Sequence, residues 1–499
     1  MNRCAGILLH PLSLPGSIGG GTLNDQVDTF LDFCKEHHQT IWQVLPLGPT
    51  GYGDSPYQSF STHAGNPYLI SIEELVKSGL ATEEELEKSK FDCDEAKIDY
   101  CNLYEKRRPA LYAIAEQFEK RADKKQKAAF KKFCEEQEHW LEDYVLYMAI
   151  KEEQEKSWQE WPAPLRKRRK PALDKVRTEK ATVLDIHRVI QWFFNEQWQA
   201  VRAKAKKAGV KILGDIPIFV ALDSADAWAN PDLFQFDKER KPLAVAGVPP
   251  DYFSKDGQLW GNPLYKWEKH QSTRFRWWAD RIRSSLRLYD MVRIDHFRGF
   301  AGYWSVPAGE KTAIGGEWKK APGEKLFKLL QSEFPDLPVV AEDLGDITPD
   351  VNELRDQFEL PGMKVLQFAF SEPTNDFLPH NYRSNFVVYT GTHDNDTTAG
   401  WYEDEERTQE QKFFRHYLGL REDISTEEAV EQMVRLAMRS VADICIVPFQ
   451  DVLKKGSDCR MNTPSQASDN WQWRMTSEEL TKKQGWLLEA TWITGRKAP

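Results

Sequence analysis

The sequence Asp290-Met-Val-Arg-Ile-Asp-His-Phe-Arg-Gly299 joins a short apolar run to a charged end. The run predicts a buried strand. Residues i and i+2 of a strand point to the same side, so Arg293 and Asp295 would project together from the strand's end. A carboxylate beside a fixed cation stays ionised, as a carboxylate nucleophile must. An ordinary surface or core ion pair would have the same sequence, and this segment alone leaves both interpretations open.

Seven further runs of this kind occur along the chain, and most are separated by segments with helical spacing. Strands that alternate with helices form parallel sheets through right-handed crossovers. Eight such units favour a closed barrel over a doubly wound sheet. We therefore predict an α/β fold, a (β/α)8 TIM barrel with large inserted subdomains in its βα loops, forming a single catalytic domain over residues 1–499. The predicted strands are Ala5–Leu9, Thr40–Leu45, Val210–Ile216, Asp290–Ile294, Pro338–Ala341, Met363–Phe368, Asn385–Tyr389 and Ala442–Val447.

Two gaps between predicted strands are too long for plain βα units and predict insertions. The first gap contains apolar residues at helical spacing, so we predict a mainly helical insertion over residues 73–200. The second gap predicts a loop-rich insertion over residues 217–288 that lines the substrate cleft. Within it, Gly247–Pro263 is so rich in turn formers that we predict an ordered loop without helix or strand.

Composition excludes several classes of protein. The chain has 499 residues and a net charge of -10, which argues against a nucleic-acid partner because such proteins carry a basic footprint. No run approaches the roughly 18 apolar residues of a membrane span, and the N-terminal run is too short for a signal peptide. The 7 cysteines include no Cys-x-x-Cys pair, so we predict a cytoplasmic protein without a disulfide framework or zinc site. The sequence leaves the oligomeric state open.

Carboxylates follow four of the predicted strands. Asp215 ends the third strand, Asp295 the fourth and Glu342 the fifth, and Asp394 follows the seventh. In a parallel barrel the active site lies at the carboxyl ends of the strands, so these four side chains should meet at one rim. Such a cluster could hold Mg2+ or Mn2+. It could also be the carboxylate machinery of glycoside chemistry.

Glycoside chemistry requires one ionised carboxylate and one carboxyl group with a raised pKa. Arg293 would keep Asp295 ionised, and Glu342 would carry the proton, because like charge and desolvation raise the pKa of a carboxyl group. Asp394 and His393 would hold sugar hydroxyls. Several of the 18 tryptophans fall in polar segments rich in proline and glycine. Aromatic faces on loops suit sugar rings, which favours the glycoside interpretation over the metal site.

Nine short motifs extend this interpretation over most of the chain: Asp54–Gln58, Ala64–Tyr68, Gly214–Pro217, Gln258–Pro263, Arg293–Gly299, Ala341–Gly345, Gly391–Asn395, Arg460–Pro464 and Asn470–Arg474. With these motifs the sequence resembles the 4-α-glucanotransferases (amylomaltases or disproportionating enzymes), relatives of the α-amylase superfamily. The Arg-x-Asp and Thr-His-Asp segments are common to the superfamily. The Ser-Pro-Tyr-Gln, Trp-Gly-Asn-Pro and Asn-Trp-x-Trp-Arg segments make the resemblance specific to the narrower family.

The resemblance implies a 4-α-glucanotransferase that moves a segment of a 1,4-α-D-glucan to the 4-hydroxyl of an acceptor glucan or glucose. It implies a retaining double displacement with Asp295 as nucleophile, Glu342 as acid and base, and Asp394 as the stabiliser of the transition state. It also implies α-1,4-glucans and maltooligosaccharides as binding partners, with no cofactor and no metal. The substrate-binding residues that it implies are Arg293, His393, Tyr57, Asp215, Trp260, Ser55, Gln258, Asn462 and Pro464.

The sequence departs from the family pattern in one loop, where Ser465 and Asp469 replace the small residue and glycine that relatives often carry. The preferred chain length and the cyclisation activity therefore stay open. Two alternatives also stay open. The first is an α-glucan hydrolase of the same superfamily, which would use the same three carboxylates. The second is a non-catalytic glycogen- or starch-binding protein, against which the presence of all three carboxylates argues.

Overall fold

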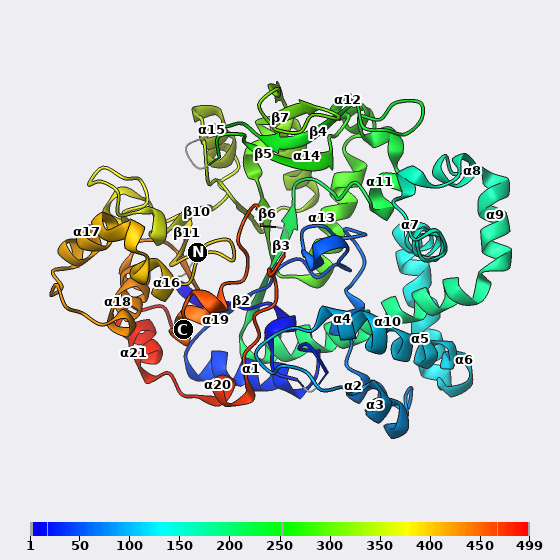
Figure 1. Cartoon of the computed structure of the whole chain (residues 1–499), viewed down its shortest axis with the longest axis horizontal. Coiled ribbons are helices and arrows are strands. Elements are labelled where there is room, and N and C mark those ends of the chain that lie inside the picture. Colours follow the sequence, from blue (N-terminus) through cyan, green and yellow to red (C-terminus); the bar gives the residue numbers. More distant parts are fainter. Residues whose placement is uncertain (1–2, 17, 251–253, 467, 498–499) are drawn as a thin grey trace.

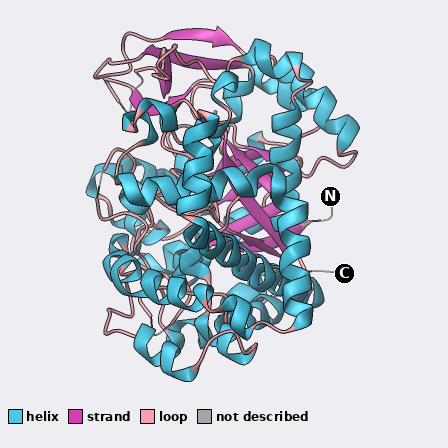
Figure 2. Ribbon diagram, turned by 90° about the vertical axis from the view of Figure 1, so that its right-hand side faces the viewer, coloured by secondary structure: helices cyan, strands magenta, loops and turns pink. Residues whose placement is uncertain are grey.

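Eight parallel strands form a barrel at the centre of the molecule, and helices surround it (Figure 1; Figure 2). The structure, a computed structural model, describes residues 3–16, 18–250, 254–466 and 468–497. The strands adjoin in the order β10-β11-β12-β1-β2-β3-β6-β9, so the first strand of the chain pairs with the last. Each falls on a predicted strand, and the predicted (β/α)8 barrel is confirmed. The strands are β1 (Cys4–Leu8), β2 (Ile41–Gln43), β3 (Lys211–Pro217), β6 (Met291–Asp295), β9 (Val339–Ala341), β10 (Gly362–Val365), β11 (Phe386–Tyr389) and β12 (Ile444–Pro448).

Helices α2 to α10 occupy the chain between β2 and β3, and the later ones of this series lie at the right of Figure 1. The longest is α7 (Lys124–Gln154). It starts at a capping box, in which Asp123 and Gln126 each accept the other's backbone N–H. The other helices of this segment are α2 (Ile72–Lys77), α3 (Glu83–Ser89), α4 (Tyr100–Asn102), α5 (Arg108–Glu116), α6 (Phe118–Arg121), α8 (Ala163–Arg166), α9 (Lys170–Glu179) and α10 (Ala181–Ala208).

The remaining helices follow the other strands of the barrel, as the alternation of strands and helices predicts. They are α1 (Asp25–Glu36), α11 (Ala225–Ala229), α12 (Trp267–Ser272), α13 (Arg276–Leu288), α14 (Gly323–Glu333), α15 (Pro349–Gln357), α16 (Thr398–Glu403), α17 (Thr408–Leu418), α18 (Thr426–Arg439), α19 (Phe449–Val452), α20 (Ser477–Thr481) and α21 (Gly485–Ile493). Among the helices of the described ranges, none combines the length and the apolar character needed to cross a membrane.

The barrel closes between β9 and β10. The N–H of Ala341 donates to the carbonyl oxygen of Pro361 at 2.8 Å. The carboxylate of Asp343, two residues beyond β9, accepts the N–H of Met363 at 2.7 Å. A side chain therefore supplies a hydrogen bond across this seam that a strand ladder would otherwise supply.

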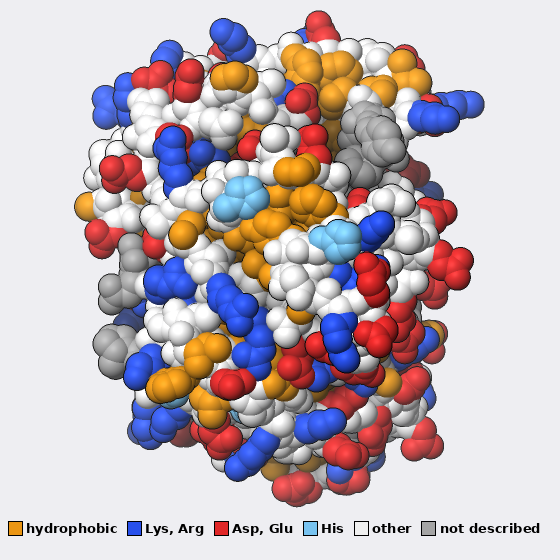
Figure 3. Space-filling view, turned by 90° about the vertical axis from the view of Figure 1, so that its left-hand side faces the viewer, with side chains coloured by type: hydrophobic (Ala, Val, Ile, Leu, Met, Phe, Trp, Pro, Cys, Tyr) orange, Lys and Arg blue, Asp and Glu red, His pale blue; other side chains and the backbone are white. Residues whose placement is uncertain are grey.

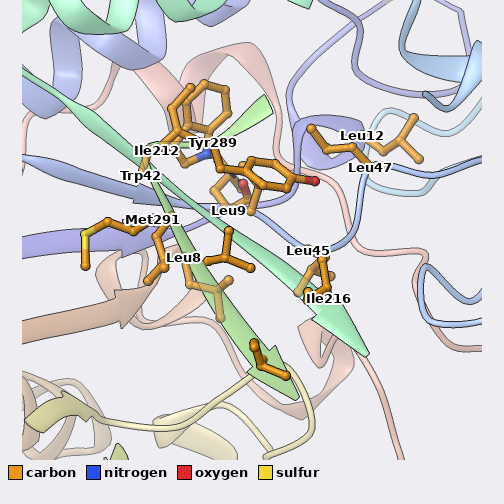
Figure 4. Close-up of a cluster of buried hydrophobic side chains, with 14 of the residues drawn as sticks. Leu8, Leu9, Leu12, Trp42, Leu45, Leu47, Ile212, Ile216, Tyr289 and Met291 are labelled. Carbon is orange, nitrogen blue, oxygen red and sulfur yellow. Dashed lines mark hydrogen bonds between the residues drawn. The ribbon is translucent and has the colours of Figure 1, made fainter. Parts of the chain in front are cut away.

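Buried side chains from adjacent strands form the core, part of which Figure 4 shows. Trp42 of β2 faces the surrounding helices. Its ring centroid lies 5.0 Å from that of Phe30 in α1 and 6.2 Å from that of Trp198 in α10. Gly214 of β3 leaves space for the ring of Tyr289, which would lie 2.1 Å from a Cβ atom at that position. A larger residue there would displace the ring beside the strand that carries Asp215.

A second, antiparallel sheet with the strand order β5-β4-β7-β8 lies at the top of Figure 1. The prediction of a loop without strands over Gly247–Pro263 is wrong, because this sheet includes the start and the end of that stretch. β7 supplies backbone partners for β4, so turn-forming residues are held in a ladder that their own propensities do not favour. Residues 251–253 of the stretch lie outside the described residues. The four strands are β4 (Ala244–Val248), β5 (Gln258–Pro263), β7 (Gly302–Pro307) and β8 (Glu317–Lys320).

Acidic and basic side chains intermix over the face of the molecule shown in Figure 3, around hydrophobic side chains at its centre. This distribution agrees with the moderate net charge of -10. A nucleic-acid binder would instead gather basic residues into one patch or stripe.

Candidate active site

The carboxylates of Asp215 and Asp295 meet at the carboxyl ends of adjacent strands β3 and β6, as predicted. Arg293 joins them: its guanidinium donates to Asp215 Oδ2 at 2.8 Å and to Asp295 Oδ1 at 2.7 and 3.2 Å. The Arg293 and Asp215 side chains are buried, whereas 31% of the Asp295 side chain is exposed. The partly exposed carboxylate is therefore held by a buried cation and remains accessible to a ligand.

Tyr57 and His393 extend this network. The Tyr57 hydroxyl donates to Asp215 Oδ2 at 2.8 Å and lies 3.5 Å from His393 Nδ1. The two rings stack with centroids 5.0 Å apart and an interplanar angle of 17°. Trp471 tilts against both rings at 5.8 Å. Tyr57 comes from the loop after β2 and His393 from the loop after β11, so the stacking ties together two parts of the barrel rim that β12 and β1 separate.

Asp394 is held by Arg460 and Asn462, which belong to the chain segment that follows α19. Asn462 Nδ2 donates to Asp394 Oδ1 at 2.6 Å, and Arg460 donates to the carbonyl oxygen of Asp394 at 2.6 Å. His393 Nε2 lies 3.4 Å from Asp394 Oδ2. The Asp394 side chain is 46% exposed, so a carboxylate that Asn462 and His393 approach and whose backbone Arg460 holds still faces the open rim.

Glu342, at the end of β9, is held by two backbone donors. The N–H of His296 donates to Glu342 Oε2 at 2.6 Å, and the N–H of Leu344 donates to Oε1 at 2.9 Å. His296 follows Asp295 directly and has a left-handed backbone conformation, with φ of 55°. The turn at the end of β6 therefore positions the neighbouring Asp295 and Glu342 through one short segment.

The two central carboxyl groups differ in how their surroundings shift their pKa values. Burial, and then the negative charge of Asp295, raise the pKa of Glu342 to about 8. This is the direction and the cause that the sequence predicted. Burial also raises the pKa of Asp295, and Arg293 opposes that rise. The expectation that Arg293 favours the ionised form of Asp295 is thus right in sign, but burial outweighs this effect.

The supporting groups are shifted as well. Burial raises the pKa of Asp215 to about 7, against the opposing effect of Arg293. Burial alone would lower the pKa of Arg293, but Asp215 and Asp295 outweigh it and raise that pKa well above its ordinary value. Burial lowers the pKa of His393 to about 4, so this imidazole is neutral near pH 7. A neutral imidazole can both donate and accept a hydrogen bond, which suits a sugar hydroxyl.

The other predicted binding residues are Trp260, Gln258, Ser55 and Pro464, and they differ in the contacts that they make. The ring of Trp260 meets that of His296 edge-on at 4.7 Å, and Gln258 accepts the Trp260 indole N–H at 3.1 Å. Ser55 accepts the backbone N–H of Tyr57 at 3.3 Å and therefore shapes the loop that carries Tyr57. Pro464 lies exposed two residues beyond Asn462.

Several groups that hold the site were not predicted from the sequence. Three are polar contacts described above: the N–H groups of His296 and Leu344, and the guanidinium of Arg460. A fourth is Asp451, which is buried and accepts hydrogen bonds from Thr390 and Thr398 on either side of the Asp394 loop. Backbone donors leave no trace in residue types. Arg460 begins the Arg460–Pro464 motif, and its place two residues before Asn462 was the available signal.

Asp343 is expected to stabilise the barrel seam beside Glu342. Its buried carboxylate binds the guanidinium of Arg355 as well as the N–H of Met363. Asp343→Asn would leave Arg355 without its buried counterion, so we expect the free energy of unfolding to fall by about 3 kcal/mol in urea denaturation. Asp356→Asn is the matched control, because Asp356 binds the same arginine but is 53% exposed, and should change stability by less than about 0.5 kcal/mol. Equal effects of the two variants would contradict the role of the seam.

Among the described residues, no group of three or more His, Cys, Asp or Glu side chains is arranged to hold a metal ion. The carboxylates at the rim are instead joined to Arg293, Asn462 and backbone N–H groups.

A comparison with models of protein families matches residues 9–481 to the family described as 4-alpha-glucanotransferase. The chain belongs to the 4-alpha-glucanotransferase family. The family and enzyme class predicted from the motifs are confirmed.

Relatives in this family match the chain almost from end to end. The 4-alpha-glucanotransferase of Thermus thermophilus is 49% identical over 98% of both chains, and that of Synechocystis sp. is 46% identical over 99% of this chain and 98% of the relative. A solved amylomaltase from Streptococcus agalactiae, in complex with acarbose, superposes with a TM-score of 0.95 and 39% identity over 100% of both chains. The 4-alpha-glucanotransferase fold thus extends over the whole length of this chain.

Proposed function

We propose that the protein transfers a segment of an α-1,4-glucan or maltooligosaccharide to the 4-hydroxyl of an acceptor glucan or glucose through a covalent glycosyl-aspartate. In the first step, Asp295 attacks the anomeric carbon and forms an ester. The bond from that carbon to the leaving oxygen breaks, and Glu342 gives its proton to that oxygen. Asp394 and His393 hold hydroxyls of the donor sugar while positive charge develops on its ring.

In the second step, the 4-hydroxyl of the acceptor attacks the same carbon. Glu342 takes the hydroxyl proton, and the ester bond to Asp295 breaks. Two inversions leave the configuration of the anomeric carbon unchanged. Esterification removes the negative charge of Asp295, which had raised the pKa of Glu342. The pKa of Glu342 therefore falls when this residue must act as a base.

The observation that carries this proposal is the pairing of Asp295 and Glu342. One is bound to the buried cation Arg293, and the other is held by the N–H of His296, the residue directly after Asp295. Their different environments support the proposed roles of Asp295 as nucleophile and Glu342 as proton carrier. The acarbose complex of the Streptococcus agalactiae amylomaltase supports an α-glucan as the ligand.

Incubation with maltotriose tests the proposed transfer. We expect glucose together with a ladder of longer maltooligosaccharides, separated by chromatography. Glucose and maltose as the sole products would identify an α-glucan hydrolase instead, and unchanged maltotriose would favour a non-catalytic binding protein.

The pH dependence of kcat/KM should report the ionisation of Glu342. The first step requires protonated Glu342, whose pKa is raised to about 8, so kcat/KM should be maintained up to about pH 8 and fall about tenfold per unit above it.

The Asp295→Asn variant should lower the pKa of Glu342, because it removes the negative charge that raises this pKa. NMR of protein with 13C-labelled glutamate measures the pKa. An unchanged Glu342 pKa in this variant would contradict the electrostatic coupling.

We further propose that segment 73–200 is a mainly helical insertion. We also propose that segment 217–288 is an insertion that lines the substrate cleft, which the contact of Trp260 with His296 supports. A cytoplasmic location is supported by the cysteines, since all seven are described and free. Titration with a thiol reagent after denaturation should count seven reactive thiols.

A further inference from the structure

A groove of about 450 Å3 opens between the helical segment after β2 and the helices that precede β6, and none of the predicted site residues lines it. We call it the α7–α13 groove. In Figure 1, α13 is labelled near the centre of the molecule, and α7 and α11 are labelled to its right. Its principal side chains are Trp140 and Asp143 of α7, Asp226 of α11, Asp232 of the 3-10 turn Pro231–Leu233, and Trp277 and Asp280 of α13.

The carboxylates of the groove are already paired. Arginines hold three of them at their outer edge, and the fourth accepts hydrogen bonds from a neighbouring loop. Arg276 also lines the groove, 3.7 Å from Asp280 and with an 85% exposed side chain, so the groove carries charges of both signs and favours neither a simple cation nor a simple anion. Remaining lone pairs on these oxygens can accept hydrogen bonds from neutral hydroxyls. The ion pairs are Asp143 with Arg168 at 2.5 Å, Asp232 with Arg240 at 3.1 Å and Asp280 with Arg283 at 2.5 Å.

Two tryptophans give the groove rigid apolar walls. The Trp140 ring stacks on His63 at 5.9 Å with an interplanar angle of 15°, and its indole N–H donates to Gln137 at 3.0 Å. Trp277 packs against Tyr265 at 5.7 Å. Burial lowers the pKa of His63 to about 4, so the imidazole behind Trp140 is neutral near pH 7. Fixed aromatic rings beside ion-paired carboxylates that can still accept hydrogen bonds suit a ligand that is apolar on its faces and hydroxylated at its edge.

The groove is joined to the loop that carries Tyr57. Asp226 accepts the backbone N–H of Thr62 at 2.8 Å and the Thr62 hydroxyl at 2.8 Å. The N–H of Ala225 donates to the carbonyl oxygen of Phe60 at 2.8 Å. One wall of the groove is therefore the back of the segment whose front reaches Asp215, and a ligand bound in the groove would lie behind the active-site rim.

We propose that the α7–α13 groove is a second glucan-binding site, which holds a remote part of a long α-glucan and has no catalytic groups of its own. Its volume lies within the usual range of ligand pockets, about 300 to 1,000 Å3. Only the choice of an α-glucan as ligand depends on the proposed function. The groove should therefore contribute to the binding of long chains and leave the turnover of maltotriose unchanged.

Two variants of the full chain test the groove in different ways. Trp277→Ala removes one aromatic wall, and Ala229→Trp fills the groove, because Ala229 lines it. We expect each to weaken retention by amylose in native gel electrophoresis by about tenfold, the equivalent of one lost stacking contact. The rate on maltotriose should stay within about twofold of the parent. The matched control is Trp492→Ala, since Trp492 is 59% exposed and lies outside the groove.

Full retention of the Ala229→Trp variant would overturn the proposal, even if Trp277→Ala loses retention through weaker packing. A second measurement reports on the groove directly. In protein labelled with 5-fluorotryptophan, the 19F signal that is absent from Trp277→Ala identifies Trp277, and it should shift when maltoheptaose is added. A shift with spermidine and none with maltoheptaose would assign the groove to cations and overturn the glucan site. Loss of maltotriose turnover in the parent would instead contradict the proposed function.

Discussion

Replacing Asp295 with asparagine is expected to lower kcat on maltotriose by about four orders of magnitude or more, because the amide cannot form the ester. The amide keeps the shape of the carboxylate and leaves Arg293 in place. Binding of α-glucans should therefore survive, which isothermal titration with maltoheptaose measures. Loss of both turnover and binding would indicate a damaged site and would not support a role as nucleophile.

The Asp295→Ala variant gives a sharper test of the same role. It opens space beside the anomeric carbon, and azide can attack there from the face that the carboxylate leaves vacant. With α-maltosyl fluoride as donor, azide should restore turnover and yield β-maltosyl azide, of inverted configuration, while fluoride departs without needing a proton. Asp346→Asn is a suitable control, since Asp346 is 70% exposed in the loop that follows β9. An α-configured azide from Asp295→Ala would remove Asp295 from its role.

Replacing Glu342 with glutamine is expected to lower kcat on maltotriose by about two to four orders of magnitude, the usual contribution of a general acid and base. The loss should depend on the leaving group. With α-maltosyl fluoride, formation of the glycosyl-aspartate should remain fast, because fluoride needs little protonation. Rapid-quench measurement of fluoride release should therefore show a burst, and an equally slow first turnover on the fluoride would contradict the assignment.

Azide also distinguishes Glu342 from Asp295. In Glu342→Ala the glycosyl-aspartate still forms, and azide attacks it from the opposite face, so the product should be α-maltosyl azide with retained configuration. The two alanine variants should thus give opposite anomers from one donor, which proton NMR resolves. The same anomer from both variants would refute the division of roles between the two residues.

The Glu342→Gln variant should also be more stable than the parent at high pH. The pKa of Glu342 is raised from 4.5 to about 8 on folding, so between these pH values the folded state binds more protons than the unfolded state. Stability from this group is therefore present below about pH 4.5 and is lost as the pH rises toward 8. Glutamine avoids this loss, and urea denaturation should give a gain on the order of 4 kcal/mol at pH 8 and little at pH 4. An equal gain at both pH values would contradict an ionisation effect.

Much of the barrel could be predicted from the sequence because its strands are buried on both faces. Runs such as Ile444–Pro448 are apolar throughout and end in turn or polar residues, a pattern with few other interpretations. The antiparallel strand Gln258–Pro263 lacks this pattern. Its glycine and proline residues favour turns, and its ladder partners come from β4, whose own partner β7 follows β6 in the chain. Local propensity cannot reveal a partner that tertiary structure supplies.

The same distinction applies to the active site. Side chains at strand ends, such as Asp215 and Glu342, could be predicted because parallel strands deliver their carboxyl ends to one rim. The backbone N–H of His296, which holds Glu342, depends on a left-handed φ of 55° that residue type does not specify. The depth of burial that raises the pKa of Asp295 is likewise set by packing around the strand, which Arg293 and Asp295 alone do not determine.

The pairing of β1 with β12 has a consequence for the synthesis of the chain. Cys4 is in register with Ile444, so one edge of β1 has no neighbour until the ribosome has released the last barrel strand. At about 5–20 residues per second, that wait is roughly 20–90 s. Throughout it the nascent chain presents an open strand edge, which other chains can pair with. Ribosome-bound chains that stop before residue 444 should therefore require a chaperone to stay unaggregated, whereas the released protein should not.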